Sequence, residues 1–331
     1  MTATPDLFAP GAPAGVAAAA APAIRPTLAE RWYIDKRLKG LVRFAIAITA
    51  LNILGHLWLG FEQSWITPFV ALAAAYTTEI VAETVQARAD ARRARYLNGP
   101  GATITLLLSA HISAMACGML LFAAEQLWCV AFAASIAVLS KHVCRVPVLE
   151  ADGKVHLRHF LNPSNFGITA TLLLWPSVGI APPYMFAENI SGWLDWVLPL
   201  AVICTGSFLN TKLTGRMPLI AAWLGFFAVQ AVLRSVFGGD PIGATLVPMT
   251  GFAFILFTFY MVTDPATSPS NRRNQVLFAA AVAAGYALVI ELHIVFGLFY
   301  ALTAVTAIRG AWLWFVYRRQ VAAGASERAA V

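Results

Sequence analysis

Long apolar runs alternate with short polar segments along most of the chain, and this pattern predicts helices that cross a membrane. A helix needs about 20 apolar residues to cross the ~30 Å hydrocarbon core of a bilayer. Stretches of approximately this length run over residues 41 to 61, 65 to 83, 101 to 122, 124 to 142, 163 to 182, 191 to 208, 216 to 236, 244 to 263, 274 to 292 and 294 to 317. We therefore expect an all-α, polytopic membrane protein whose transmembrane domain covers residues 41 to 317 with about ten helices.

The two ends of the chain lie outside these stretches. Residues 1 to 27 are rich in Ala and Pro and lack the early basic residues of a secretion signal, so a disordered tail is expected. Residues 28 to 40 mix aromatic, aliphatic and basic side chains, which indicates an interfacial helix, although a plain charged lead-in explains them equally well. Residues 318 to 331 are expected to form a cytoplasmic tail.

Composition supports the membrane assignment. The 331 residues are 59% hydrophobic and 12% charged, whereas soluble domains carry about 25% charged residues. The formal net charge of +7 therefore does not indicate a nucleic-acid partner. The four cysteines form no Cys-x-x-Cys pair, so no metal site is predicted.

Basic residues report the orientation of the spans. Twenty-one of the 23 Lys and Arg residues fall on alternate connecting segments, and the segments between them carry mainly acidic residues. Because positive charge is retained on the cytoplasmic side, we expect both termini in the cytoplasm and the protein in the plasma (inner) membrane. Glu79 and Glu83 lie one turn apart near a basic segment, and we expect them to pair with nearby arginines.

Polar residues interrupt the apolar pattern first at positions 159 to 167, His-Phe-Leu-Asn-Pro-Ser-Asn-Phe-Gly. Asn162 or Ser164 can cap a helix that has Pro163 in its first turn. Asn162, Asn165 and Thr169 also place amide and hydroxyl groups at membrane depth, where such groups commonly line a ligand or ion site. Both interpretations stay open.

The second polar motif is Gly-Gly-Asp-Pro-Ile-Gly-Ala-Thr at positions 238 to 245. Asp240 and Pro241 are ordinary turn residues, and a turn alone explains the motif. Alternatively, the backbone at Gly243 and Ala244 can approach a phosphate closely at a helix start. The hydroxyl of Thr245 could then carry a phosphoester.

The third motif is Met-Val-Thr-Asp-Pro-Ala-Thr-Ser-Pro at positions 261 to 269. Its two prolines are expected to end the eighth helix, and Ser270 or Asn271 to start the next. A helix-stop loop explains the motif. The donors and acceptors gathered there also suit a planar polar ring, and they come from Thr263, Asp264, Thr267 and Ser268.

These motifs together resemble a known family. Gly243-Ala-Thr245, ahead of a span that closes in Thr-Asp-Pro-Ala-Thr-Ser-Pro at 263 to 269, resembles the RnfD protein of the Rnf electron-transport complex and the NqrB protein of the sodium-pumping NADH:quinone reductase. The pattern Asn162-Pro-x-x-x-Gly167 is similar to theirs too. The resemblance covers most of residues 159 to 317 and is strongest to the UnbU branch found near enediyne biosynthesis genes. Ile242 stands where that family usually has Ser or Thr.

The resemblance implies a flavin-dependent electron-transfer subunit built from two inverted five-helix repeats. It implies flavin mononucleotide joined by a phosphoester to Thr245. We expect electrons to pass between this outer site and a cytoplasm-side site near Asp264, and a second flavin is an open alternative. The polar motifs and the resemblance together give these candidate cofactor-binding residues: Asp240, Gly243, Ala244, Thr245, Asn162, Asn165, Thr263, Asp264, Thr267 and Ser268. The implied partners are other redox subunits, a flavin transferase and membrane lipid.

A second hypothesis comes from another functional class. The same scaffold without flavin could serve as a channel or exporter for a small solute or natural product. A visible absorption spectrum would separate the two functions.

Overall fold

The computed structural model describes residues 36–149, 155–182, 186 and 188–329. The tail expected at 1 to 27 and most of the interfacial helix expected at 28 to 40 lie outside these residues. Residues 36 to 40 form the first turns of α2 (Lys36–Leu54), which runs on into the first apolar stretch. At the other end, α12 (Gly297–Ala329) continues as a helix through most of the tail expected at 318 to 331.

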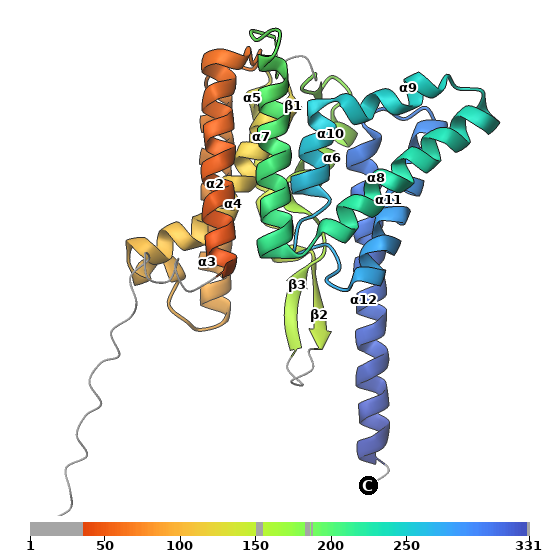
Figure 1. Ribbon diagram of the computed structural model, residues 1–331. Coiled ribbons are helices and arrows are strands. Elements are labelled where there is room, and N and C mark those ends of the chain that lie inside the picture. The colour runs from red at the N-terminus through yellow and green to blue at the C-terminus, as the bar shows by residue number, and fades with distance from the viewer. Residues whose placement is uncertain (1–35, 150–154, 183–185, 187, 330–331) are drawn as a thin grey trace, which may run out of the picture.

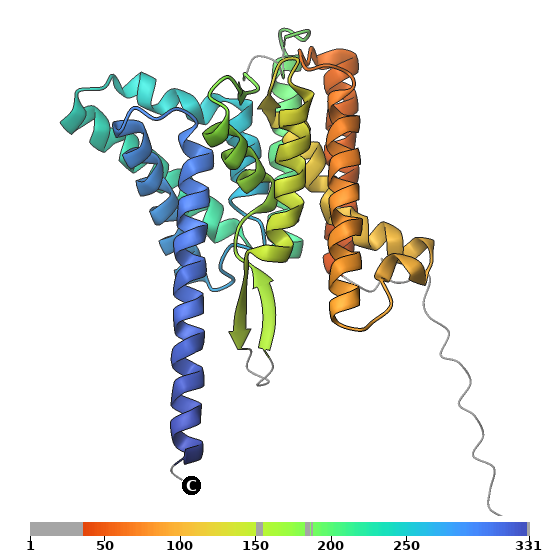
Figure 2. The same ribbon diagram turned by 180° about the vertical axis from the view of Figure 1, so that it is seen from behind.

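Helices form most of the described chain (Figures 1 and 2). The first half contains α2, η1 (Gly55–Leu59), α3 (Thr67–Ala89), η2 (Arg95–Asn98), α4 (Pro100–Leu120), α5 (Leu127–Val143) and α6 (Pro163–Leu174). The second half contains α7 (Leu194–Leu209), η4 (Asn210–Thr214), α8 (Met217–Leu233), η5 (Arg234–Gly238), α9 (Ile242–Leu246), η6 (Val247–Thr250), α10 (Phe252–Leu256), η7 (Phe257–Met261), α11 (Arg272–Glu291) and α12. A helix therefore covers at least part of every apolar stretch.

The described residues contain six helices that are long and apolar enough to cross a membrane. They are Leu38–Leu59, Pro100–Leu120, Leu194–Thr214, Met217–Gly238, Arg272–Glu291 and Gly297–Ala322. A bent pair, Ile242–Thr250 with Phe252–Met261, makes a seventh if both parts form one span. The chain is thus an all-α, polytopic membrane protein, with fewer helices of full length than the ten stretches predict.

Local sequence explains two of the differences. The fifth stretch forms a helix only as far as Leu174, because Trp175 precedes Pro176 and a residue before proline is disfavoured in the helical region. In the eighth stretch, Gly251 has extended backbone angles (φ −76°, ψ 141°) and separates two short helical pieces that meet at 64°. The expected straight span at 244 to 263 is therefore a broken one.

Two pairs of short strands join the helices. β2 (Arg145–Leu149) and β3 (Val155–His159) form an antiparallel hairpin between α5 and α6, with Arg145 opposite His159. β1 (Leu121–Phe122) pairs with β4 (Gly179–Ile180) after α4 and α6. The β2–β3 hairpin lies at the end of the molecule opposite α9, and β2 packs against α12 (Figure 1).

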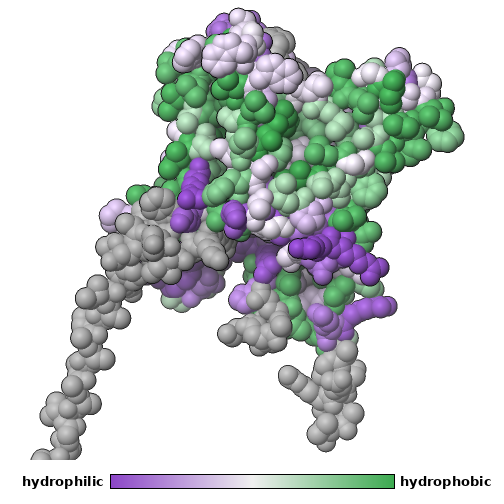
Figure 3. Space-filling view, viewed as in Figure 1, coloured by the Kyte–Doolittle hydropathy of each residue, from purple (hydrophilic) through white to green (hydrophobic). Residues whose placement is uncertain are grey.

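The outer surface is strongly apolar. Large side chains such as Phe237 and Trp193 are 82% and 75% exposed. Figure 3 shows apolar residues over the helical region, with hydrophilic residues gathered below it, toward the β2–β3 hairpin and the lower part of α12. Such a large apolar surface is suited to contact with lipid rather than water.

Capping residues confirm two of the expected helix starts. The Asn162 side chain accepts a hydrogen bond from the Asn165 backbone N–H at 3.0 Å and caps α6. The Asn271 side chain accepts from the Arg273 backbone N–H at 2.9 Å and caps α11. The polar motifs at 159 to 167 and 261 to 269 thus end and start helices as the sequence predicts.

Candidate functional site

A cavity of about 640 Å³ lies between the first and second halves of the helical domain. Residues of α2 and α4 form its wall on one side, and residues of α7, η4 and η7 form the other. The start of α6 and the loop after η7 complete it at one end. Small-molecule sites typically enclose about 300–1,000 Å³, so the cavity is large enough for a multi-ring organic ligand.

Two stacked aromatic rings stand on the cavity wall. The rings of Phe44 from α2 and Tyr260 from η7 lie 5.0 Å apart between centroids, with an angle of 18° between their planes. The Tyr260 hydroxyl is 2.9 Å from Thr205 Oγ1, which also lines the cavity. Aromatic faces of this kind can pack against a planar ligand.

The first and third polar motifs meet at one end of this cavity. Asn162 Nδ2 donates a hydrogen bond to the Met261 carbonyl oxygen at 3.1 Å, and Asn162, Thr263 and Asp264 all line the cavity. The Thr263 hydroxyl, in the turn after η7, donates to the Phe259 carbonyl oxygen of η7 at 2.7 Å. The structure therefore brings three of the predicted site residues together, from segments about 100 positions apart.

A lysine from α5 also contributes to the cavity wall. Lys141 Nζ donates to Glu79 Oε2 and to Ser109 Oγ, each at 2.8 Å. Lys141 is 8% exposed and Glu79 4% exposed, so the pair is buried. Lys141 and Ser109 both line the cavity, which places a cationic side chain at its edge.

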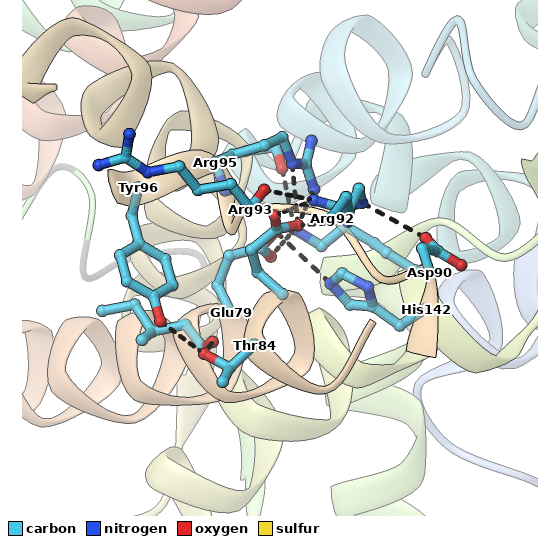
Figure 4. A network of polar contacts seen from close by, with 12 residues as sticks. Glu79, Thr84, Asp90, Arg92, Arg93, Arg95, Tyr96 and His142 are labelled. Carbon is cyan, nitrogen blue, oxygen red and sulfur yellow. Dashed lines mark hydrogen bonds and ion pairs between the residues drawn. The ribbon is translucent and has the colours of Figure 1, made fainter. Parts of the chain in front are cut away.

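Glu79 and Glu83 take different partners. Glu83 is fully buried and accepts hydrogen bonds from Arg92 Nη1 at 2.6 Å and Arg95 Nε at 2.9 Å, as expected. Arg92 also donates to Asp90 at 3.3 Å (Figure 4), and the hydrogen bond to Glu83 raises the pKa of Arg92. The arginine partner expected for Glu79 is wrong within the described residues, because α5 brings Lys141 to 2.8 Å and His142 to 3.5 Å from its carboxylate. This network anchors the loop after α3.

Asn165 and Thr169 point away from the cavity. Asn165 Nδ2 donates to the Phe299 carbonyl oxygen at 3.0 Å and to Thr303 Oγ1 at 2.7 Å, both on α12. Thr169 Oγ1 donates to the same carbonyl oxygen at 3.2 Å. Both side chains hold α6 against α12, so neither joins Asn162 in lining the cavity.

Thr267 and Ser268 lie on the far side of the same loop. Thr267 Oγ1 donates to Asp264 Oδ2 at 2.9 Å and Ser268 Oγ donates to the Asp264 carbonyl oxygen at 2.7 Å. Neither residue lines the large cavity; Ser268 lines a second, smaller one of about 80 Å³. Pro265 and Ala266 line both.

The second polar motif lies apart from the other two, at the α9 end of the molecule (Figure 1). Thr245 is 5% exposed, and its hydroxyl donates to the Ile242 carbonyl oxygen at 2.9 Å. Ala244 is exposed, and Gly243 has open space where a side chain would stand. Asp240 accepts a hydrogen bond from Arg234 at 2.5 Å. This motif contributes nothing to the large cavity.

Several side chains around the two cavities do not follow from the sequence pattern. In the sequence, Lys141 and Arg216 are only two of the basic residues that indicate the orientation of the spans. Phe44 and Tyr260 lie inside apolar stretches, where an aromatic residue carries no separate signal. Arg309 does carry a signal in the sequence, because an arginine inside a membrane span is costly and usually functional.

No protein-family model matches this chain, and no curated protein matches its sequence. A function is therefore assigned from the chemistry of the cavity. That chemistry combines an apolar interior, a stacked aromatic pair and a polar end formed by Asn162, Thr263 and Asp264.

Proposed function

We propose that this protein is a membrane-embedded electron-transfer subunit that binds a flavin in the large cavity. The observation that carries the proposal is the stacked pair Phe44 and Tyr260 beside a polar end formed by Asn162, Thr263 and Asp264. A flavin ring has flat apolar faces, one apolar edge and one edge rich in hydrogen-bonding groups. The cavity offers a matching distribution of aromatic, apolar and polar surface.

In this proposal each group of residues has a separate task. Phe44 and Tyr260 pack against the ring, and Asn162 and Asp264 orient its polar edge. A bound flavin supplies the redox chemistry, while the protein supplies position and electrostatics.

We further propose that the helices form two inverted five-helix repeats with both termini in the cytoplasm of a plasma (inner) membrane. Corresponding helices pack alike in the two halves: α3 on α5 and α5 on α6 in one, and α8 on α11 and α11 on α12 in the other. A buried asparagine also recurs. Asn52 on α2 donates to Met119 Sδ at 3.9 Å, and Asn210 after α7 donates to the Phe259 carbonyl oxygen at 2.9 Å. Each links the first helical segment of its half to the third.

Covalent flavin at Thr245 stays a prediction of the family resemblance. Ester formation requires the hydroxyl to leave the Ile242 carbonyl oxygen, at a cost of about 0.5–1.5 kcal/mol. The open space beside Gly243 leaves room for a phosphate. This proposal brings with it a flavin transferase, further redox subunits and surrounding membrane lipid as partners.

A second candidate is transport of a small solute or natural product. The observation that favours it is the break at Gly251, because discontinuous helices commonly line the substrate sites of transporters. Leu256, Phe259 and Tyr260, which follow the break, line the large cavity. Transport requires the cavity to open on both faces of the membrane, whereas electron transfer does not.

The visible absorption spectrum of the purified full-length protein tests the proposal. We expect a flavin band that a chemical reductant bleaches and that air restores. Protein purified without flavin should regain the band on addition of riboflavin or flavin mononucleotide. If neither flavin binds, electron transfer is excluded in favour of transport, and uptake of candidate solutes into proteoliposomes becomes the next measurement.

A further inference from the structure

The smaller cavity lies between the β2–β3 hairpin, the loop after η7, the start of α8 and α12. Its volume is about 80 Å³, too small for a flavin ring and suited to a single compact group. Basic and hydroxyl side chains dominate its polar lining, namely Arg158, His159, Arg216, Ser268, Ser270 and Arg309. Three arginines from three different elements therefore surround one small space.

Arg216 is buried and makes no ion pair with any residue that the structure describes. It is 6% exposed, and its guanidinium donates to Ser268 Oγ at 2.8 Å. Its other hydrogen bonds go to the carbonyl oxygens of Thr214, Pro265 and Ser268 at 3.3–3.4 Å. No carboxylate of the described residues lies within 4.0 Å of it. Asp264 stabilises the Arg216 charge through a longer-range electrostatic interaction, without direct contact.

Arg309 on α12 is a half-buried arginine on the same lining. Its Nη1 donates to the Thr267 carbonyl oxygen at 2.9 Å, and within the described part of the chain it too makes no ion pair. It lies near Arg216, so these two like charges repel one another across the cavity. Positive charge held out of water without a counter-charge is costly. An anion in the cavity would remove that cost.

We propose that the smaller cavity binds a phosphate group. Arginine guanidinium groups bind phosphate oxygens through paired, charge-assisted hydrogen bonds. Ser268 and Ser270 add hydroxyl groups on the same lining. The phosphate is held where the hairpin, the loop and α12 meet, so binding ties these three elements together.

The position of the site connects it to the large cavity. Pro265, Ala266 and His159 line both cavities, and Asp264 and Ser268 face opposite sides of one loop. Two sources of phosphate fit this position: a soluble phosphate, free or carried by a ligand of the large cavity, and a lipid headgroup. If the phosphate belongs to a flavin bound in the large cavity, this inference rests on the proposed function.

Thermal unfolding of the full-length protein in uncharged detergent tests the site, with inorganic phosphate as the probe and chloride at equal ionic strength as the reference. We expect the unfolding temperature to rise with phosphate and to saturate. Arg309→Gln should weaken the apparent Kd about tenfold or more. Arg319→Gln removes the same charge from an exposed position on the same helix and should leave the Kd unchanged.

Because Arg309→Gln also removes the bond to Thr267, Ser270→Ala provides a second variant. Ser270 is exposed at the rim, and its substitution should weaken phosphate binding roughly two- to tenfold without loss of buried contacts. A phosphate effect no larger than that of chloride overturns the proposal. An equal loss in Arg319→Gln overturns it too, since it shows screening of surface charge.

Further arms identify the source of the phosphate. Flavin mononucleotide binding more tightly than riboflavin, with the difference removed by Arg309→Gln, assigns the site to a soluble ligand. Stabilisation by phosphatidic acid but not phosphatidylcholine in nanodiscs, removed by the same variant, assigns it to a headgroup. If no flavin binds but phosphate still stabilises, the electron-transfer proposal fails and the anion site stands.

Discussion

Lys141 Nζ lies 2.8 Å from Glu79 Oε2, and this buried ion pair joins α5 to α3 at the edge of the large cavity. Ser109 on α4 accepts a second hydrogen bond from the same ammonium group. The pair thus fixes three helices at one point. Both charges are nearly inaccessible to water, so Lys141 depends on Glu79 for compensation, and the other carboxylate oxygen of Glu79 lies 3.5 Å from His142 Nε2.

Breaking this pair should strongly destabilise the protein. Lys141→Met leaves the buried Glu79 carboxylate with only His142 beside it, at 3.5 Å, and we expect a loss of about 3–5 kcal/mol in the free energy of unfolding. The double substitution Lys141→Met with Glu79→Gln should recover much of the loss. Thermal unfolding in detergent measures both. Asp90→Ala, which removes an exposed ion pair with Arg92, is the control and should cost no more than ~1 kcal/mol.

Substitutions of Asn162 and Asn165 should affect different properties, flavin affinity and stability respectively, although the two residues lie three positions apart. Asn162 caps α6 and reaches the Met261 carbonyl oxygen at the cavity, whereas Asn165 holds α6 to α12. We expect Asn162→Ala to weaken flavin binding roughly two- to tenfold, the value of one hydrogen bond. Asn165→Ala should lower stability by about 1–3 kcal/mol and leave the flavin affinity unchanged.

Titration of flavin into the deflavinated variants measures these affinities. Equal losses of affinity in the two variants would contradict the separate roles and indicate a general effect on α6.

The aromatic pair offers a third prediction. Phe44→Ala removes one ring from the cavity wall and should weaken flavin binding roughly two- to tenfold, since such contacts contribute about 0.5–1.5 kcal/mol. Phe315→Ala removes a ring of another aromatic pair, with Trp312 on α12 and outside the cavity, and should have no effect. Flavin retained through purification, read from the visible spectrum, compares the two. An unchanged Phe44→Ala spectrum would place the flavin elsewhere.

The sequence predicts helical segments better than it predicts their lengths. Hydrophobicity averaged over a window locates each helix, but it does not register a single backbone break such as Gly251 or an early stop such as Trp175 before Pro176. The helix caps Asn162 and Asn271 are predictable because capping depends on local backbone geometry. Features that depend on one or two residues therefore follow from the sequence only where those residues have a specific local role.

The candidate site is predictable only in part, for a related reason. The meeting of Asn162 with Met261 follows from two polar motifs placed at helix ends on one face. The sequence does not predict where the Asn165 side chain points, because this depends on which helix packs against that face of α6. In the structure this helix is α12. In the sequence, Lys141 and Arg216 are recognised only as basic residues. Whether such a residue is buried depends on how the other helices pack around it.

Orientation in the membrane gives a fourth prediction. The basic segments predict Arg92 and Arg272 in the cytoplasm and Asp240 outside. Reporter fusions or cysteine accessibility at these positions in intact cells measure the topology. Arg272 and Asp240 flank the broken span, so finding both on one side would make Ile242–Thr250 and Phe252–Met261 a re-entrant loop rather than a crossing.

Thr245 gives the last prediction, and it separates attached from dissociable flavin. When the protein is co-expressed with a flavin transferase, the denatured chain should keep flavin fluorescence, and Thr245→Val should abolish it. Valine has nearly the same shape and loses only the bond to the Ile242 carbonyl oxygen, so stability should fall by no more than about 1.5 kcal/mol. Flavin in the large cavity, which Thr245 does not line, should survive the substitution. Fluorescence that leaves the wild-type chain on denaturation would mean that Thr245 keeps its hydroxyl buried and carries no ester.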